Sequence, residues 1–220
     1  MTLNKSASTT VHNILASGFR LPTVLYSLIH RRVVSPWLAD FMRGGGFYGT
    51  HLLPSSRNID LLVAGGVTRV IVHVRDPRQV VISGMEHVRL YPREMPPSMR
   101  EKLDIRSAGR VEAAIREFLS DAIAWIEGWM DARNKLAVEF TTFEEFVRDP
   151  TQFFDRLLSL YAGHTRYFDR RAALAASPKA EYHRRRGTTD EWRELLNAKQ
   201  IEQVNARMPP AFWSTFGWSP

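Results

Sequence analysis

The stretch VTRVIVHVRDPRQVVISGMEHV, residues 67–88, decides the fold that we expect for this chain. Its first part, Val67 to Val74, is nearly all apolar and rich in β-branched side chains, which is typical of a strand buried in a parallel sheet. Asp76 and Pro77 follow at once, and these are favoured residues for an N-cap and for the first position of a helix. The stretch therefore predicts a buried strand followed directly by a helix over Pro77 to Val88.

Outward from this stretch, helical and strand patterns alternate along the chain. Apolar residues recur at three- and four-residue steps from about Arg110 to Ala132, which predicts the longest helix. Leu136 to Phe140 is a short strand candidate, and a further helix is expected at about Thr151 to Tyr161. The proline-rich segment Tyr91 to Ser98 is expected to be a loop and is the best candidate for a mobile flap.

The alternation of strands and helices predicts an α/β fold, with a central, mostly parallel sheet flanked by helices. A chain of 220 residues is long enough for one substantial core, so we expect a single domain over residues 1–220. Residues 1–17 lack the pattern of a secretory signal, and the apolar stretch Leu21 to Met42 is interrupted by charged residues and a proline. We therefore expect a cytoplasmic protein without a membrane span.

The amino-acid composition limits the kinds of site and of partner that the chain can have. The chain has no cysteine, which excludes a disulfide framework, thiolate zinc sites and cysteine nucleophiles. Its formal net charge of +7 favours anionic partners. Nucleic acid, an acidic membrane surface and a polyphosphorylated small molecule all fit that charge.

Three elements have the composition of anion sites, and the first is Asn4 to Thr10, ahead of a helical pattern over Val11 to Ala16. Small hydroxyl residues and Lys5 at a helix start suit an anion, because the first backbone N–H groups of a helix are unpaired and its dipole is positive there. The common nucleoside-triphosphate loop, a glycine, four residues and then Gly-Lys-Ser/Thr, is absent. By itself such a cluster is more often an ordinary N-cap.

The second element is Arg75 with Ser83. Arg75 follows the predicted parallel strand, at the edge where open α/β sheets bind ligands, and Ser83 lies about two turns into the next helix. A guanidinium group and a hydroxyl together suit a phosphate monoester. The alternative is that Arg75 pairs with Asp76 or a nearby loop and that Ser83 lies on the surface.

The third element is Arg185-Arg186-Gly187, directly before Thr188 to Glu191, which has the form of a capping box and predicts a helix start. Glycine lets a backbone approach a ligand closely. Read alone, the element is as well explained by a solvated charged surface or a nucleic-acid patch.

Together and in this order, the elements resemble the sulfotransferase family that uses 3'-phosphoadenosine-5'-phosphosulfate (PAPS). Lys5-Ser6-Ala7-Ser8-Thr9 resembles its Lys-Ser-Gly-Thr-Thr-like phosphosulfate loop, and Arg75, Pro77 and Ser83 resemble its 3'-phosphate motif. Arg185-Arg186-Gly187 with Glu191-Trp192 is similar to its C-terminal Arg-Lys-Gly segment.

Two further segments extend the resemblance from residue 4 to about residue 193. Thr50-His51-Leu52-Leu53-Pro54 is similar to the Thr-His-Leu-Pro segment that carries the catalytic base, and Phe143 to Pro150 resembles the segment beside the adenine. The chain departs from the family at Ala7, where a glycine is usual, and at Phe143, where a tyrosine is usual. It also has Gly49 where a lysine is common, and only Met1-Thr2-Leu3 stands where the family has its first strand.

The resemblance implies a P-loop-like phosphosulfate-binding loop and an in-line sulfuryl transfer from PAPS, which leaves PAP (3',5'-adenosine bisphosphate). Lys5 would neutralise charge on the leaving oxygen, and His51 would take the acceptor's proton, a role that suits the ordinary histidine pKa of about 6.5. Without the motif, His51 reads as a structural histidine. The implied cofactor-binding residues are Lys5, Ser6, Ala7, Ser8, Thr9, Thr10, Arg75, Ser83, Phe143, Arg185, Arg186 and Gly187.

The acceptor stays open at this point. A hydroxyl or amine of a small molecule or carbohydrate is implied, in a pocket shaped by residues 19–48, including Phe19, Trp37, Phe41 and Tyr48, and by the loop at 91–109. No metal, nucleic acid or membrane span is expected. The alternatives are a degenerate member that binds PAP without catalysis, a P-loop phosphotransferase and a basic nucleic-acid-binding protein.

Overall fold

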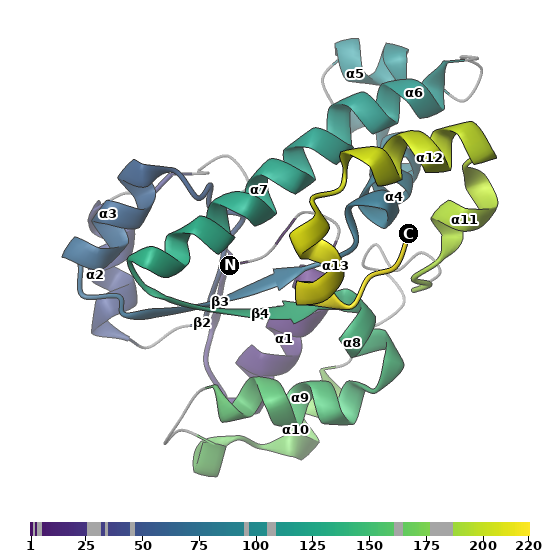
Figure 1. Cartoon of the computed structure of the whole chain (residues 1–220). Coiled ribbons are helices and arrows are strands. Elements are labelled where there is room, and N and C mark those ends of the chain that lie inside the picture. Colours follow the sequence, from purple (N-terminus) through teal and green to yellow (C-terminus); the bar gives the residue numbers. More distant parts are fainter. Residues whose placement is uncertain are drawn as a thin grey trace. The chain divides into compact units, whose positions relative to one another are not determined.

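The computed structural model describes residues 1, 3, 6–25, 32–33, 35–44, 47–94, 97–104, 109–160, 165–176 and 187–220. The chain forms two compact units. Figure 1 labels their helices and strands. The first unit comprises Met1–Val74 and Trp125–Gly187, and the second comprises Arg75–Ala124 and Thr188–Pro220.

The first unit contains the predicted buried strand, β3 (Arg69–Val74), which pairs in parallel with β4 (Ala137–Thr142). On the other side of β3, the His73 N–H donates to the Met1 carbonyl at 2.8 Å and the Leu3 N–H donates to the His73 carbonyl at 2.8 Å. This is the bonding pattern of a parallel neighbour. Met1 and Leu3 therefore bond to β3 as a parallel neighbour would. The expected parallel α/β arrangement is confirmed.

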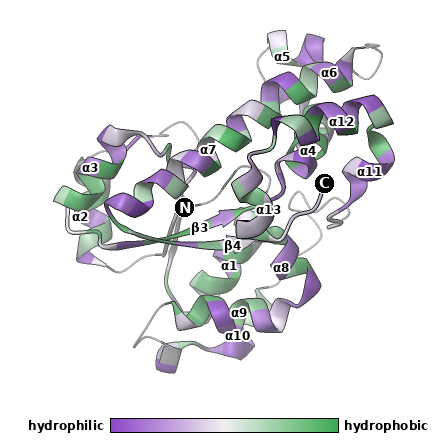
Figure 2. Cartoon of the chain, in the orientation of Figure 1, coloured by the Kyte–Doolittle hydropathy of each residue, from purple (hydrophilic) through white to green (hydrophobic). Residues whose placement is uncertain are grey.

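Helices pack beside this sheet to form the core of the first unit. Val11 and Leu15 of α1 (Ser8–Gly18) cluster with Phe153, Leu157 and Leu158 of α9 (Pro150–Ser159), and Ile71 of β3 packs against them. Hydrophobic colouring is concentrated on α1 accordingly (Figure 2). Burial of these apolar faces fixes α1, and with it the chain segment that precedes α1, to the sheet.

The remaining elements of the first unit are short. A second parallel pair joins β1 (Thr23–Leu25) to β2 (Phe47–Gly49). The other helices, α7 being shared with the second unit, are α2 (Ser35–Arg43), α3 (Ser56–Ala64), α7 (Ser120–Asp131), η3 (Ala132–Asn134), α8 (Phe143–Arg148), η4 (Thr165–Tyr167) and α10 (Arg170–Ala175).

The second unit is helical and is organised around α4 (Pro77–Leu90), the helix predicted to follow the buried strand. The Asp76 carboxylate accepts the Arg78 N–H at 2.9 Å, as expected of an N-cap, and Pro77 is the first helical residue. Its other helices are η1 (Pro92–Glu94), α5 (Pro97–Lys102), α6 (Arg110–Ala114), η2 (Ile115–Leu119), α11 (Glu191–Leu195), α12 (Ala198–Arg207) and α13 (Pro210–Phe216).

Several element predictions need correction. The capping box predicted for Thr188 to Glu191 is wrong: α11 begins at Glu191 after Asp190, whose side chain makes no cap bond, and Glu191 is buried against Gln79 Nε2 at 3.0 Å. The predicted loop at 91–98 contains η1 and the start of α5. The long helix predicted from Arg110 is present as α6, η2 and α7, with a π-helical turn at η2.

Within the described ranges, none of the helices combines the length and the apolar character needed to cross a bilayer.

Candidate active site

The predicted phosphosulfate loop leads into α1 through a left-handed residue. Ala7 has φ 59° and ψ 28° and occupies the N-cap of α1 without a side-chain cap bond. Successive N–H groups around a left-handed residue form a concavity that binds anions, and the α1 N-terminus adds a positive dipole. Ser8 and Thr10 are half-buried and Thr9 is exposed, so the start of α1 is accessible to a ligand.

The underside of the loop is fixed by Ser6. Its hydroxyl donates to the Leu3 carbonyl at 2.7 Å, and the side chain is fully buried. The Ser6 carbonyl lies 2.8 Å from Nε2 of His73 on β3. The Ser6 hydroxyl thus ties the loop to Leu3, and the binding of Ser6 to phosphate stays a prediction.

The segment Thr50 to Pro54, which carries His51, is held from several directions. Trp125 Nε1 donates to the Leu52 carbonyl at 2.9 Å, and Asn58 Nδ2 donates to the Leu53 carbonyl at 2.8 Å. Gly128 of α7 approaches Pro54 so closely that a Cβ there would lie 2.5 Å from Pro54 Cγ. His51 itself is half-buried, and the backbone that directly follows it is held by these bonds.

Gly49, where a lysine is common in the family, has no room for a side chain. A Cβ at Gly49 would lie 2.9 Å from Cδ2 of His12, a buried residue of α1. The His12 ring therefore occupies the space beside the residue that precedes Thr50 and His51. The departure at Gly49 is a consequence of packing against α1.

In the second unit, Arg75, one of the predicted 3'-phosphate residues, contacts Thr188. Arg75 follows β3 directly and is 7% exposed, and its Nη2 donates to the Thr188 carbonyl at 2.8 Å. Thr188 is the residue after Gly187, which has φ 69°. Ser83 lies on α4 and is half-buried.

The turn that carries Arg75 is braced by a buried ion pair. Arg78 Nη2 lies 2.6 Å from Asp76 Oδ2, and both side chains are almost fully buried. The Arg78 guanidinium also lies 3.9 Å from the ring centre of Trp192 and 5.0 Å from that of Trp213. Both aromatic contacts come from the C-terminal helices, so these helices support the turn after β3.

Phe143, predicted to contact adenine, is the first residue of α8 and is 5% exposed. Its ring centre lies 6.5 Å from that of Phe146. Thr142 and Glu145 form a reciprocal capping box at this helix start. The position of Phe143 is therefore fixed by local capping and by packing.

Some predicted residues fall outside the part of the chain that the structure describes. These are Lys5, Arg185 and Arg186, and the side chains of Trp37 and Tyr48. Sequence reasoning, in turn, missed His73, Trp125 and Gly128 as supports of the site. A lone histidine within an apolar strand and a glycine within a long helix were the available signals.

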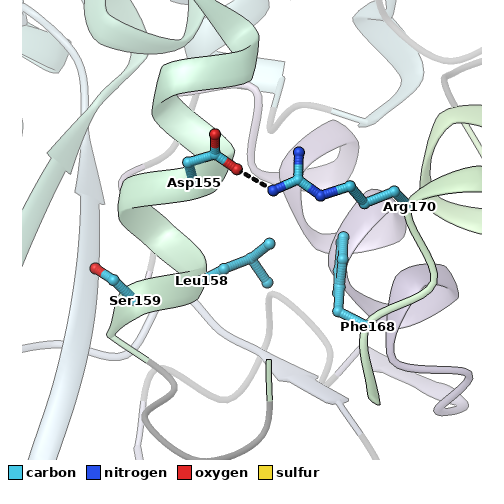
Figure 3. Close-up of a pocket in the computed structure, with 5 residues that line it drawn as sticks. All are labelled: Asp155, Leu158, Ser159, Phe168 and Arg170. Atoms are coloured by element: carbon cyan, nitrogen blue, oxygen red, sulfur yellow. Dashed lines mark hydrogen bonds and ion pairs between the residues drawn. The ribbon is translucent and has the colours of Figure 1, made fainter. Parts of the chain in front are cut away.

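A surface pocket in the first unit is lined by Asp155, Leu158, Ser159, Phe168 and Arg170 (Figure 3). Arg170 and Asp155 form an ion pair at its edge, and both side chains are about half exposed or more. None of the predicted site residues lines it, and its residues make no catalytic constellation. Among the described residues, no cluster of histidine and acidic side chains could hold a metal ion.

Comparisons with known proteins agree with the fold and with the family resemblance. The model of the sulfotransferase domain family matches residues 47–212, a range that includes parts of both units. The crystal structure of mouse sulfotransferase SULT7A1 complexed with PAP superposes with a TM-score of 0.62 and 14% identity, covering 93% of this chain and 79% of that chain. A search of curated proteins found no match. At 14% identity the likeness between the two structures establishes the fold alone. The match to the family model establishes the class of protein to which the chain belongs.

Proposed function

This chain belongs to the sulfotransferase domain family, and from that premise we propose that it transfers a sulfuryl group from PAPS to a hydroxyl or amine of an acceptor. The observation that carries the use of PAPS is the bond from Arg75 Nη2 to the Thr188 carbonyl at 2.8 Å. The resemblance assigns Arg75 and Gly187 to the 3'-phosphate, and Thr188 is the residue that follows Gly187. A 3'-phosphate distinguishes PAPS and PAP from ADP and ATP.

In this proposal, different residues bind the different parts of PAPS. The Ala7 backbone, the α1 N-terminus, Ser8 and Thr9 bind the 5'-phosphosulfate, with Lys5 neutralising the oxygen that leaves. Arg75 and Ser83 bind the 3'-phosphate, together with Arg185, Arg186 and Gly187. Phe143 provides an apolar contact for adenine. A set of fixed N–H and cationic groups of this kind stabilises developing negative charge without reorganisation.

The transfer itself needs one base. The acceptor oxygen or nitrogen attacks sulfur in line, the bond from sulfur to the bridging oxygen breaks, and PAP departs with that electron pair. His51 accepts the proton that the acceptor loses. Catalysis rests on positioning and charge stabilisation, as in phosphoryl transfer. The single-domain organisation, the cytoplasmic location and the absence of a metal requirement stay predictions.

Calorimetric titration with PAP, with ADP as the comparison ligand, tests the proposal. Wild type should bind PAP at least tenfold more tightly than ADP. Arg75→Ala should weaken PAP binding by about ten- to a hundredfold, because a charged hydrogen bond contributes about 1.5–3 kcal/mol. ADP binding should change little.

The matched control is Arg57→Ala, which removes the same charge from an exposed position on α3. It should leave PAP binding unchanged. Equal affinity of wild type for PAP and ADP would contradict the proposal. PAP binding without sulfuryl transfer to any acceptor would favour the degenerate, nucleotide-binding alternative.

A further inference from the structure

His73 is a polar residue inside an apolar strand. Its neighbours Val72 and Val74 are fully buried, and His73 itself is 3% exposed. Burying an imidazole is costly unless its nitrogens find partners. A histidine in this buried strand therefore needs hydrogen-bond partners for its ring nitrogens, which offset the cost of burial.

Both ring nitrogens have partners, and these partners define one tautomer. Nε2 lies 2.8 Å from the Ser6 carbonyl oxygen, and a carbonyl oxygen only accepts, so Nε2 carries the hydrogen. Nδ1 lies 3.0 Å from Thr141 Oγ1 and, in the neutral ring, accepts the hydroxyl hydrogen. The edge-to-face contact with Phe153, at 5.6 Å between ring centres, fixes the ring plane.

This arrangement orients one peptide of the predicted phosphosulfate loop. The His73 bond draws the Ser6 carbonyl toward β3, beneath the loop. In a trans peptide the next N–H points the opposite way, so the Ala7 N–H points away from β3. That direction leads to the side of the loop on which a ligand of the α1 N-terminus would bind.

Two further hydrogen bonds join Ser6 and His73 through Leu3. The Ser6 hydroxyl donates to the Leu3 carbonyl at 2.7 Å, and the Leu3 N–H donates to the His73 carbonyl at 2.8 Å. Ser6, Leu3 and His73 are thus joined in a buried ring of hydrogen bonds. The loop peptide is held before any ligand arrives, which is the preorganisation that an anion site needs.

We propose that His73 is a positioning residue that aims the Ala7 N–H at the 5'-phosphosulfate of PAPS. The inference rests on the proposed function, since it deepens the assignment of that loop. His73 acts through the Ser6 peptide and does not touch the nucleotide. It therefore acts on the 5' end of the nucleotide and not on the 3'-phosphate, which Arg75 binds in the second unit.

The test compares two nucleotides and three variants. PAP has both phosphates, whereas adenosine 3'-monophosphate lacks the 5'-phosphate. His73→Leu should weaken PAP binding about tenfold and leave binding of adenosine 3'-monophosphate unchanged within twofold. His73→Gln should restore most of the PAP affinity, because its amide N–H reaches the position of Nε2. His73→Asn is too short to reach Ser6 and should behave like His73→Leu.

Controls separate this role from general destabilisation. The Gln and Asn variants are both polar and near in size, so they carry the comparison if the leucine variant does not fold. His87→Leu on α4 serves as the matched histidine control and should leave both affinities unchanged. In wild type, ¹⁵N–¹H correlation spectra of the imidazole should show the Nε2–H tautomer.

Two results would overturn the inference. One is an equal loss of affinity for both nucleotides in His73→Leu and His73→Asn. The other is a loss of PAP affinity that His73→Gln does not restore. Failure of the proposed function looks different, because wild type itself would then show no preference for PAP over ADP. In that case the proposed role of His73 would be wrong as well.

Discussion

At the scale of single residues, Ala7 has a backbone conformation that alanine rarely adopts. Its φ of 59° lies in the left-handed region, which costs an L-residue about 1–2 kcal/mol. Glycine has no such cost there, although it loses about 0.5–1 kcal/mol through its greater freedom in the unfolded chain. Ala7→Gly should therefore raise the free energy of unfolding by about 0.5–1 kcal/mol, as measured by urea denaturation.

The same substitution elsewhere provides the control. Ala124 is exposed within α7, and Ala124→Gly should lower the free energy of unfolding by about 1 kcal/mol, the ordinary cost of glycine in a helix. If both variants are destabilised equally, the left-handed conformation of Ala7 carries no strain.

His51 is the residue on which the proposed chemistry depends. General base catalysis contributes about 10²–10⁴ in rate, so His51→Asn should lower kcat by that factor. PAP affinity should be unchanged, since the base faces the acceptor in the proposal. Steady-state rates of wild type should also fall toward acid pH as the imidazole is protonated, and this limb should vanish in the variant. Unchanged turnover in His51→Asn would return this histidine to a structural role.

At the scale of elements, the approach of α7 to the His51 segment depends on Gly128. A Cβ at Gly128 would lie 2.5 Å from Pro54 Cγ and 3.0 Å from Pro54 Cβ. Gly128→Ala must therefore displace the segment or the helix, at a cost of about 1–3 kcal/mol. We expect kcat to fall about tenfold with PAP affinity unchanged, because misplacing a catalytic group by a fraction of an ångström slows the reaction.

Gly109→Ala is the comparison for this prediction. A Cβ at Gly109 meets no atom within 4 Å, so Gly109→Ala should cost only the roughly 0.5 kcal/mol by which glycine is preferred over alanine at the N-cap of α6. Equal effects of the two variants would show that the close approach at Gly128 is unimportant.

The same elements explain what the sequence could predict. β3 and α4 were predictable because their signals are local: a run of apolar β-branched residues, then Asp76 and Pro77. The false capping box at Thr188 to Glu191 failed for the opposite reason. The Thr188 carbonyl binds Arg75 and the Glu191 carboxylate binds Gln79, each more than a hundred residues away in the chain.

For the candidate site too, the sequence predicted some features and missed others. Resemblance selected Arg75 and the segment Arg185-Arg186-Gly187, and within the second unit Arg75 bonds to Thr188, the residue that follows this segment. It gave no indication that the Ser6 hydroxyl binds the Leu3 carbonyl. It also passed over His73, because a motif records which residues a ligand touches and not which residues hold them in place.

At the scale of the whole molecule, the formal net charge of +7 allows a nonspecific affinity for nucleic acid. Such binding is dominated by counterion release, and for 6–10 phosphate contacts it weakens by about 10³–10⁵ between 50 and 200 mM salt. A 20-base-pair DNA duplex should therefore compete with PAP only at low salt. At 200 mM salt the preference for PAP over ADP should persist, as measured by calorimetry with and without the oligonucleotide.

A competing oligonucleotide that still displaces PAP at 200 mM salt would contradict this expectation. It would favour a specific nucleic-acid site on the basic surface over a small-nucleotide site.

The central position of β3 has a consequence for biosynthesis. His73 meets partners 67 residues before it and 68 residues after it in the chain, and contacts at such separations form slowly. Translation at about 5–20 residues per second would keep β3 without β4 for about 3–14 s, while an apolar, β-branched segment waits on the ribosome. The strand that organises the finished sheet is thus the segment of the nascent chain that we expect chaperones to cover first.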